Sequence, residues 1–485
     1  MSATVQTQLI AGLPLLLIAA GIVLVMLLVA GSRNHRAVAQ LTTLGFVLTF
    51  AACLLPQPAV GVTPLLLFDD YARFGMAIVA VCGALTVLLL YGYVESLGGY
   101  REEIYLLLLI AALGAMTLCA ARHAASLVLG LETLSVALFG MIAYPHRHTL
   151  PLEAAIKYLV LSAAASGALM FGLALVYTAT GHLQFESLHV AFSSLSSSAD
   201  RSLAWAGVAL VWAGLAFKLS IVPFHLWTAD VYHGAPAPVA GFLAAVSKGA
   251  VAVLLLRWLD AAALQQAPAL AQMLALLAVL SIAVGNLAAL VQNNVKRVLA
   301  YSSIAHFGYL LVPFLVGGAT AREAVLVYVA SYAVMTLGSF GAITVLSEPA
   351  TGEDADHLYD YRGLFWRRPL VTSTFTPMLL AQAGMPLTMG FLAKFYVLAA
   401  AVEQQAWALA LAVVIGSAIG LYYYLRLIVV QFLPRPGGMR REGVLSETSL
   451  TAGAALVVLT ALLLGFGVAP QSLLAGVTQA LSSLN

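Results

Sequence analysis

Long apolar segments alternate with short polar breaks along almost the whole chain. A helix needs about 20 consecutive apolar residues to cross the hydrocarbon core of a bilayer. Windows of that length predict fourteen transmembrane helices, so we expect an all-α polytopic membrane protein. The approximate spans are 8–30, 37–55, 74–93, 104–121, 123–144, 151–179, 203–226, 235–258, 268–292, 295–316, 322–346, 370–402, 404–432 and 448–476.

The seventh and twelfth predicted helices contain helix-breaking residues. In WAGLAFKLSIVPFHL, Pro223 follows Lys218 by five residues, and in AQAGMPLTMGFLAKFY, Gly384 and Pro386 precede Lys394. Proline removes a backbone donor and clashes with the preceding turn. Such a break is tolerated at membrane depth only where protein or water supplies new hydrogen-bond partners. Matched breaks five helices apart therefore indicate a transport site within an inverted repeat.

This pattern predicts how the chain is organised. Helices 4–8 and 9–13 would form two five-helix repeats, which an odd number of helices places in opposite orientations. The predicted segments are 1–103 with helices 1–3, 104–258 with the first repeat, 268–432 with the second, and 448–485 with helix 14.

Composition agrees with a membrane protein and excludes several other functions. The chain is 62% hydrophobic and 9% charged, with a mean hydropathy of +0.99, whereas soluble domains carry about 25% charged residues. The first apolar run has no basic leader, so we expect a retained helix. No Walker loop, dinucleotide motif or metal-ligand cluster is present. We therefore expect lipid contacts, no nucleic-acid partner and no cofactor or metal bound by this chain.

The placement of Lys and Arg predicts an orientation, because cytoplasmic loops carry an excess of both. Loops after odd-numbered helices hold thirteen of them and the opposite loops hold five, so both termini are predicted to be periplasmic. The thirteen are Arg33, Arg36, Arg101, Arg147, Lys296, Arg297, Arg362, Arg367, Arg368, Arg426, Arg435, Arg440 and Arg441.

Four of the five lysines lie inside apolar runs: Lys157, Lys218, Lys248 and Lys394. An ammonium group within the membrane is costly, so ionisable residues there are functional by default. We expect them to bind and release protons. Lys157 has an alternative role, since Glu153 precedes it by four residues and a salt bridge at a helix end explains the pair.

Glu132 stands in SLVLGLETLSVALFG with no charged residue within nine positions on either side. An isolated carboxylate in the membrane needs a partner, and Lys218 is the natural candidate. The alternatives are a structural ion pair that locks two helices and a functional pair whose separation changes.

Two histidines could extend this set, because histidine titrates near neutrality. His225 lies beyond Pro223 and either relays a proton or caps carbonyls freed by the proline. His306, in YSSIAHFGYLL, either relays a proton or is simply hydrogen-bonded. Lys248 lies in GFLAAVSKGAVAVLLL, where its small neighbours leave room for water or for another helix.

Several distinctive stretches resemble a known family. They are FKLSIVPFHLWTADVYHGAPAPV at 217–239, NNVKRVLAYSSIAHFGYLL at 293–311, GFLAKFYVLA, and GLYYYLRL near the C-terminus. The chain resembles the antiporter-like membrane subunits of respiratory complex I, the proton-pumping NADH:quinone oxidoreductase, and among them the N subunits. By resemblance, Glu132 and Lys218 form an input pair, Lys248 and His306 a central relay, and Lys394 the exit group, while Lys157 modulates the input pair.

The resemblance also implies an assembly. This chain would be part of a proton-translocating enzyme in the bacterial inner membrane, beside antiporter-like M and L subunits and the small K subunit. Other subunits would hold NADH, FMN, iron–sulfur clusters and quinone, for which ubiquinone is our expectation. The alternatives are a subunit of a multisubunit sodium/proton antiporter and a passive membrane scaffold.

Overall fold

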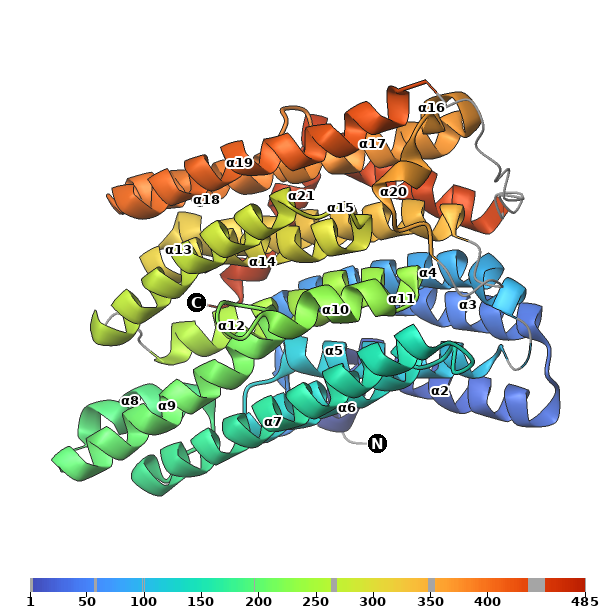
Figure 1. The fold of residues 1–485 in the computed structure, drawn as a ribbon. Helices are drawn as coiled ribbons and strands as arrows, with labels where there is room; N and C mark the ends of the chain where they lie inside the picture. Colours follow the sequence, from blue (N-terminus) through green and yellow to red (C-terminus); the bar gives the residue numbers. More distant parts are fainter. Residues whose placement is uncertain are drawn as a thin grey trace.

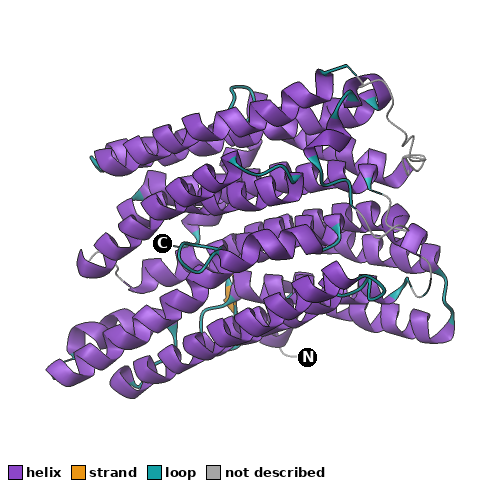
Figure 2. Cartoon of the chain, viewed as in Figure 1, coloured by secondary structure: helices purple, strands orange, loops and turns teal. Residues whose placement is uncertain are grey.

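A computed structural model describes residues 3–55, 59–97, 99, 101–195, 197–262, 268–347, 354–434 and 450–484. Arg435, Arg440, Arg441 and the first two residues of the predicted C-terminal segment lie outside these ranges. Nearly all of the described chain is helical (Figure 2). The long helices run alongside one another, with α5–α9 in one half of the bundle and α13–α19 in the other (Figure 1).

Thirteen helical spans in the described chain are long and apolar enough to cross a membrane. The remaining one of the fourteen predicted helices is the twelfth, over 370–402, and it is divided into α17 (Pro369–Ala383) and α18 (Met389–Glu403), each too short to be counted alone. The expected all-α polytopic fold is therefore confirmed. The other long helices are α2 (Leu13–Gly31), α3 (His35–Cys53), α4 (Asp70–Leu97), α5 (Glu103–Ala120), α6 (Ala124–Ile142), α7 (Thr149–Thr180), α9 (Ser198–Leu219), α13 (Pro268–Leu290), α14 (Val295–Val316), α15 (Ala319–Leu346), α19 (Trp407–Phe432) and α20 (Leu450–Val468).

Both predicted helix breaks are present. The helix α9 ends at Leu219, and the chain becomes helical again in α10 (Leu226–Gly234). The protein itself supplies partners for carbonyls near each break, as membrane burial requires. The indole of Trp227 donates to the Phe217 carbonyl over 3.0 Å, and the ammonium of Lys394 donates to the Ala383 carbonyl over 3.0 Å.

The eighth membrane span has an irregularity that the sequence did not reveal. We expected one regular helix over 235–258. The span instead consists of α11 (Ala237–Phe242), a π-helical segment η1 (Leu243–Ser247) and α12 (Lys248–Ala262). A π-turn inside an α-helix is frequent at functional sites, and this one ends directly before Lys248.

Several shorter elements also differ from the expected pattern. The polar segment 56–73 contains a small hairpin, and a helix occupies part of 180–202. Glycine and proline, which disfavour continuous helix, separate the terminal helices at Gly12 and Pro470. These elements are β1 (Val60–Gly61), β2 (Leu67–Phe68), α1 (Ala3–Ala11), α8 (Phe185–Ser194), η4 (Leu358–Tyr361), α16 (Leu364–Arg367) and α21 (Gln471–Ser482).

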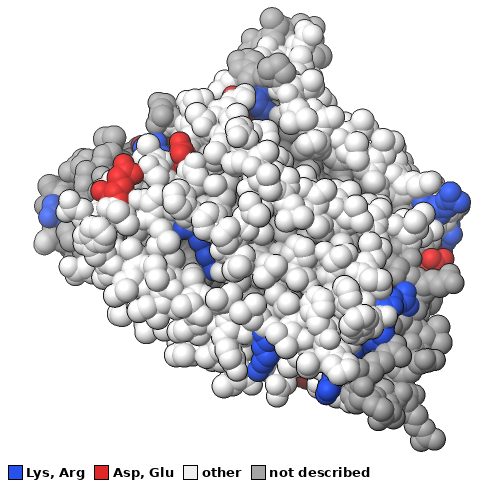
Figure 3. Space-filling view, turned by 90° about the horizontal axis from the view of Figure 1, so that it is seen from above, with Lys and Arg blue, Asp and Glu red and all other residues white. Residues whose placement is uncertain are grey.

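Ion pairs between loops define two opposite ends of the bundle. Loops that follow odd-numbered predicted helices contact one another, and loops that follow even-numbered ones do the same. The first set includes Arg33–Glu103 and Lys296–Asp354, and the second includes Arg122–Glu186 and Arg257–Asp69. Seen from one side, most of the surface is uncharged and most charged side chains lie toward its margins (Figure 3).

Replacing Gly172 with alanine is expected to destabilise the packing of α7 on α9 by about 1–3 kcal/mol, because overpacked contacts cannot relax easily. A Cβ atom at Gly172 would lie 2.6 Å from the carbonyl oxygen of Gly207. Gly167 on the same helix is the matched control, since a Cβ there meets nothing within 4 Å. Thermal unfolding of the purified complex should show the loss for Gly172→Ala alone. Equal stability of both variants would contradict the packing account.

Candidate functional site

Lys218 is held by three helices near the first break. It lies in the last turn of α9 and is 3% exposed. Its Nζ atom donates to Ser135 Oγ on α6 and to Ser162 Oγ on α7, each over 2.6 Å. The ring of Tyr158 lies 5.8 Å from the same nitrogen. Hydroxyls and an aromatic ring thus surround the buried ammonium.

Glu132 lies one helical turn before Ser135 on α6. Its side chain is partly exposed, between Leu129 and Val136, which are 60% and 63% exposed. Two serine hydroxyls, rather than the Glu132 carboxylate, accept these hydrogen bonds from Lys218. A direct Glu132–Lys218 pair therefore stays a prediction, and Ser135 is the group that links α6 to the lysine in this arrangement.

Lys248 is completely buried and has a hydroxyl partner from the other half of the chain. Its Nζ donates to Ser303 Oγ on α14 over 2.7 Å, and the Tyr332 hydroxyl on α15 donates to the same oxygen over 2.6 Å. Aromatic faces attract a nearby cation electrostatically. Three rings lie near the nitrogen, Phe307 at 5.1 Å, Tyr232 at 5.2 Å and Trp227 at 5.8 Å.

Trp227 connects the surroundings of the first two lysines. Its ring stacks on Tyr158 with a centroid distance of 4.8 Å, and Tyr158 faces Lys218. The same indole faces Lys248. Because α10 begins directly after the helix break, the interruption after α9 is what brings this indole between the two lysines.

His306 lies on α14, one turn after Ser303, and is 2% exposed. Its Nδ1 atom shares a 2.6 Å hydrogen bond with the Tyr328 hydroxyl, and its Nε2 atom shares one of 3.2 Å with the Tyr424 hydroxyl. The ring of Tyr332 lies 5.7 Å away, centroid to centroid. Tyr332 therefore contacts both the Lys248 partner Ser303 and the imidazole.

Lys394 lies beside the second break and is 7% exposed. Its Nζ atom is 5.3 Å from the centre of the Tyr309 ring, which also lies 5.7 Å from the His306 ring. Gly384, with a φ of 89°, leaves room for this lysine, because a Cβ there would be 2.8 Å from Lys394 Cδ. The break in the helix thus creates the site of the lysine.

These contacts form one continuous series, which we call the polar axis. It runs across both halves of the chain, and four of the predicted residues belong to it. The aromatic members were not predicted as site residues, since they stand among ordinary apolar positions, whereas Ser303 is one of the hydroxyls beside His306 that the sequence marks as able to hold a water chain. The axis consists of Lys218, Tyr158, Trp227, Lys248, Ser303, Tyr332, His306, Tyr309 and Lys394.

His225 lies outside the polar axis. It immediately precedes α10, is half-buried, and has a hydrogen bond to the backbone of Pro223. This contact favours the capping alternative, in which the imidazole satisfies backbone groups at the proline.

Lys157 also lies outside the axis, in a chain of ion pairs at the helix ends. Its Nζ atom is 2.7 Å from Glu153 and 2.9 Å from Asp230, and its side chain is 42% exposed. Asp230 on α10 also pairs with Arg297 on α14 over 2.8 Å. The structure therefore shows Lys157 in a salt-bridge chain that joins the two halves, as the structural alternative expected.

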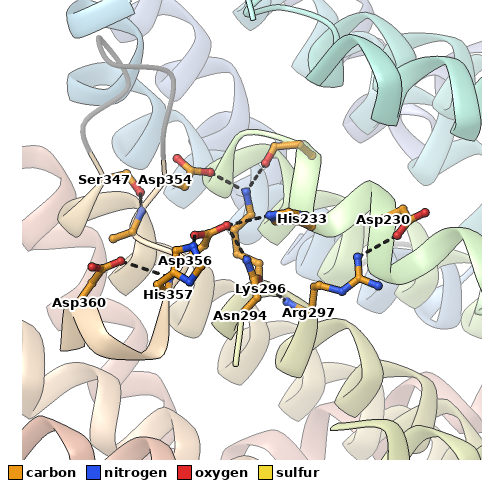
Figure 4. Close-up of polar contacts among 12 residues, drawn as sticks. Asp230, His233, Asn294, Lys296, Arg297, Ser347, Asp354, Asp356, His357 and Asp360 are labelled. Carbon is orange, nitrogen blue, oxygen red and sulfur yellow. Dashed lines mark hydrogen bonds and ion pairs between the residues drawn. The ribbon is translucent and has the colours of Figure 1, made fainter. Parts of the chain in front are cut away.

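A wider polar network lies beside the Asp230–Arg297 pair and gathers around Lys296 and Asp356 (Figure 4). Lys296 donates to Asp354 over 2.6 Å and to the Ala235 carbonyl over 2.7 Å. Asp356 accepts hydrogen bonds from Asn294 over 2.6 Å and from His233 over 2.9 Å. In the sequence, the signal for this network is the acidic part of the polar stretch 348–368.

Replacing Asp356 with asparagine is expected to lower the free energy of unfolding by about 1–3 kcal/mol at pH 7, as for a lost charge-assisted hydrogen bond. Burial opposes ionisation, but hydrogen bonds from His233 and Asn294 and the charge of Lys296 outweigh it, so the pKa of Asp356 lies below its usual value. Because the pKa is lower in the folded protein, the carboxylate contributes its full stability above the unfolded pKa of about 4. This stability is lost as the pH falls further and passes the folded pKa.

Thermal unfolding at a series of pH values measures this effect. The parent protein and Asp356→Asn should differ at pH 7 and converge below about pH 4. Asp200→Asn is the control, since Asp200 is exposed in the first turn of α9. A difference that stays constant with pH would contradict the charge-based explanation.

The transmembrane fold, the two broken helices and the axis of buried lysines define the chain as a membrane protein of the antiporter-like class. A family model described as "NADH:quinone oxidoreductase/Mrp antiporter, TM" matches residues 121–420. NADH-quinone oxidoreductase subunit N of Chromohalobacter salexigens is 48% identical over 471 residues, covering 97% of this chain and 98% of the relative. The chain belongs to the subunit N family of NADH-quinone oxidoreductase.

Further comparisons agree with this family. Subunit N of Ectopseudomonas mendocina is 47% identical over 477 residues, covering 96% of this chain and 95% of the relative. A chain of respiratory complex I from Thermus thermophilus with bound aureothin has a TM-score of 0.79 and 32% identity, with 95% and 98% coverage of the two chains. The Mrp complex from Dietzia sp. contains a similar fold, with a TM-score of 0.85, 18% identity and coverage of 98% and 97%.

Family membership establishes the kind of enzyme. The chain is a multi-pass inner-membrane subunit of bacterial complex I, an oxidoreductase and translocase that uses NADH, FMN, iron–sulfur clusters and quinone. The residues described here include no group of three or more His, Cys, Asp or Glu side chains that could hold a metal ion.

Proposed function

We propose that this subunit translocates protons through the polar axis, driven by electron transfer from NADH to quinone in other subunits. The continuous series of contacts from Lys218 to Lys394 is the observation that carries the proposal. Buried ionisable groups in membrane proteins mark ion pathways and proton relays. A neutral amine accepts a proton and an ammonium donates one, so each lysine can serve both as an acceptor and as a donor.

The position of each group suggests its role. Lys218 receives protons at the first break, and Glu132 on the neighbouring helix adjusts how readily it does so. Lys248 and His306 then transfer protons between the two halves, Lys248 through its hydrogen bond to Ser303 and His306 through its hydrogen bonds to the Tyr328 and Tyr424 hydroxyls. Lys394 releases protons at the second break. His225 and Lys157 would influence this path through the backbone and through Asp230, respectively, without carrying the proton.

We further propose that α5–α12 and α13–α19 are inverted repeats. Both begin with two helices in close glycine contact, which supports the assignment. A Cβ at Gly114 would lie 2.5 Å from the Leu134 nitrogen, and one at Gly285 would lie 2.6 Å from the Ala305 nitrogen. The loops that follow odd-numbered predicted helices carry the excess of Lys and Arg. This supports a cytoplasmic position for the end of the bundle that they form, and periplasmic termini.

The partners follow from the same family assignment. We propose that the chain contacts the M, L and K subunits in the membrane arm and takes its energy from quinone reduction outside this chain. The 48% identity to subunit N of Chromohalobacter salexigens favours this assignment over a subunit of a sodium/proton antiporter, because the chain of the Mrp complex from Dietzia sp. shares only the fold at 18% identity.

Replacing Lys218 with methionine is expected to lower proton pumping by about 100-fold, a typical effect of removing an acid–base group. Lys157→Met is the matched control, because Lys157 is an exposed lysine of the same repeat. It should retain pumping within about threefold, since exposed ion pairs contribute about 0–1 kcal/mol. Pumping is measured by dye quenching in vesicles with equal amounts of assembled complex. Equal effects of both substitutions would contradict the proposed path.

A further inference from the structure

Asn286, an uncharged residue on α13, connects aromatic hydroxyls around the second half of the polar axis. It is 0% exposed. Its Nδ2 atom donates to the Tyr309 hydroxyl over 2.9 Å and to the Ile282 carbonyl over 2.8 Å. Its Oδ1 atom accepts a hydrogen bond from the Tyr423 hydroxyl over 3.1 Å. The amide is therefore held by hydrogen bonds to groups on three helices, α13, α14 and α19.

Both tyrosine partners lead back to proton-binding groups. The Tyr309 ring lies 5.3 Å from Lys394 Nζ and 5.7 Å from the His306 ring. Tyr423 packs on Tyr424 with a centroid distance of 4.5 Å, and the Tyr424 hydroxyl is hydrogen-bonded to His306. Asn286 thus links the surroundings of His306 and Lys394 through two separate side-chain routes.

The neighbouring helix leaves space for this arrangement. Gly416 on α19 lies so close that a Cβ there would be 2.8 Å from the Tyr309 hydroxyl and 3.1 Å from Asn286 Nδ2. A larger residue would displace the hydrogen-bonded pair. Glycine at position 416 therefore lets α19 approach the Asn286–Tyr309 pair closely.

We propose that Asn286 is a positioning residue for proton transfer between His306 and Lys394. The amide carries no proton itself. It holds the Tyr309 ring beside Lys394. Through Tyr423 it also holds Tyr424, whose hydroxyl contacts His306. This inference rests on the proposed function and adds a group outside the ionisable series. Proton transfer depends steeply on donor and acceptor geometry, so misplacing these tyrosines slows the step without removing any acid or base.

Asn286→Leu in the whole complex tests this role. We expect proton pumping and NADH:quinone activity to fall about tenfold, with an increased solvent deuterium isotope effect, because transfer between His306 and Lys394 becomes rate-limiting. Tyr309→Phe should act in the same direction, and adding it to Asn286→Leu should cost little more, as expected for residues that act through one contact. Asn286→Asp in its neutral acid form can donate to Tyr309 and accept from Tyr423, so it should retain activity better than Asn286→Leu.

Gln431→Leu is the matched control. Gln431 is also a fully buried amide, on α19, but its partners are Thr376 and the Leu427 carbonyl. It should leave the isotope effect unchanged. If Asn286→Leu only reduces the amount of complex, with an unchanged isotope effect per complex, the positioning role is wrong. If the lysine variants leave pumping intact, the proposed function itself fails, whatever Asn286→Leu does.

Discussion

Replacing Lys248 with methionine is expected to lower NADH:quinone activity coupled to pumping by about 100-fold. Lys248 carries the polar axis from the first half of the chain to the second, since its ammonium donates to Ser303 on α14. Methionine is flexible, similar in length and apolar, so it can fill the space among the aromatic rings without a large packing defect. The loss would therefore come from removing the proton-binding nitrogen. The measurement is the NADH:quinone rate per assembled complex in sealed vesicles.

Lys296→Met is the control for this prediction, because Lys296 is also a buried lysine, with 2% exposure. Its ammonium is ion-paired with Asp354 at the end of the bundle and lies outside the polar axis. That substitution should lower stability and leave the NADH:quinone rate per assembled complex unchanged. A Lys248→Met complex with full coupled activity would contradict a role for Lys248 in transfer.

Replacing Asp69 with alanine is expected to destabilise the subunit by about 3–5 kcal/mol, the usual cost of removing one partner from a buried ion pair. Asp69 is completely buried and Arg257 is 7% exposed. Asp69 Oδ1 accepts hydrogen bonds from Arg257 Nη2 and from the Ala72 backbone nitrogen, each over 2.7 Å. This pair connects the beginning of α4 to α12, so its loss leaves the guanidinium uncompensated. Thermal unfolding of the purified complex measures the effect.

The double variant Asp69→Leu, Arg257→Met separates charge burial from packing. Replacing both members of a buried ion pair with apolar residues of similar size is often neutral or stabilising. We therefore expect the double variant to recover most of the stability lost in Asp69→Ala. A single variant as stable as the parent would contradict the importance of this pair, and a double variant as unstable as the single would show that packing dominates.

The sequence was sufficient to predict the class of fold and the two breaks. Pro223 and Gly384 are local helix-breaking signals, and both lie at breaks in the structure, although Pro313 and Pro377 are accommodated inside α14 and α17. The four lysines were equally visible, because charge is rare in membrane helices. Three of them lie on the polar axis, each within reach of an aromatic ring.

The rest of the site depends on packing between distant helices. Tyr309, Tyr332 and Asn286 stand in sequences typical of any buried helix face, so only their tertiary contacts distinguish them. The π-helical segment before Lys248 reads LAAVS, which contains no glycine or proline to mark an irregular turn. Lys157 was visible in the sequence, but its partner was not. Asp230 is 73 residues away, and only the fold reveals that the two side chains lie together.

The number of protons translocated per NADH oxidised, measured in proteoliposomes, tests the polar axis most directly. The variants are Lys218→Met, Lys248→Met, His306→Leu and Lys394→Met, each at equal assembly. Because the axis is a single series of contacts, an interruption at any of these positions should remove the same contribution to pumping. We predict the same reduced proton ratio for all four. An unchanged ratio at full electron-transfer rate in any one of them would contradict a single path through these residues.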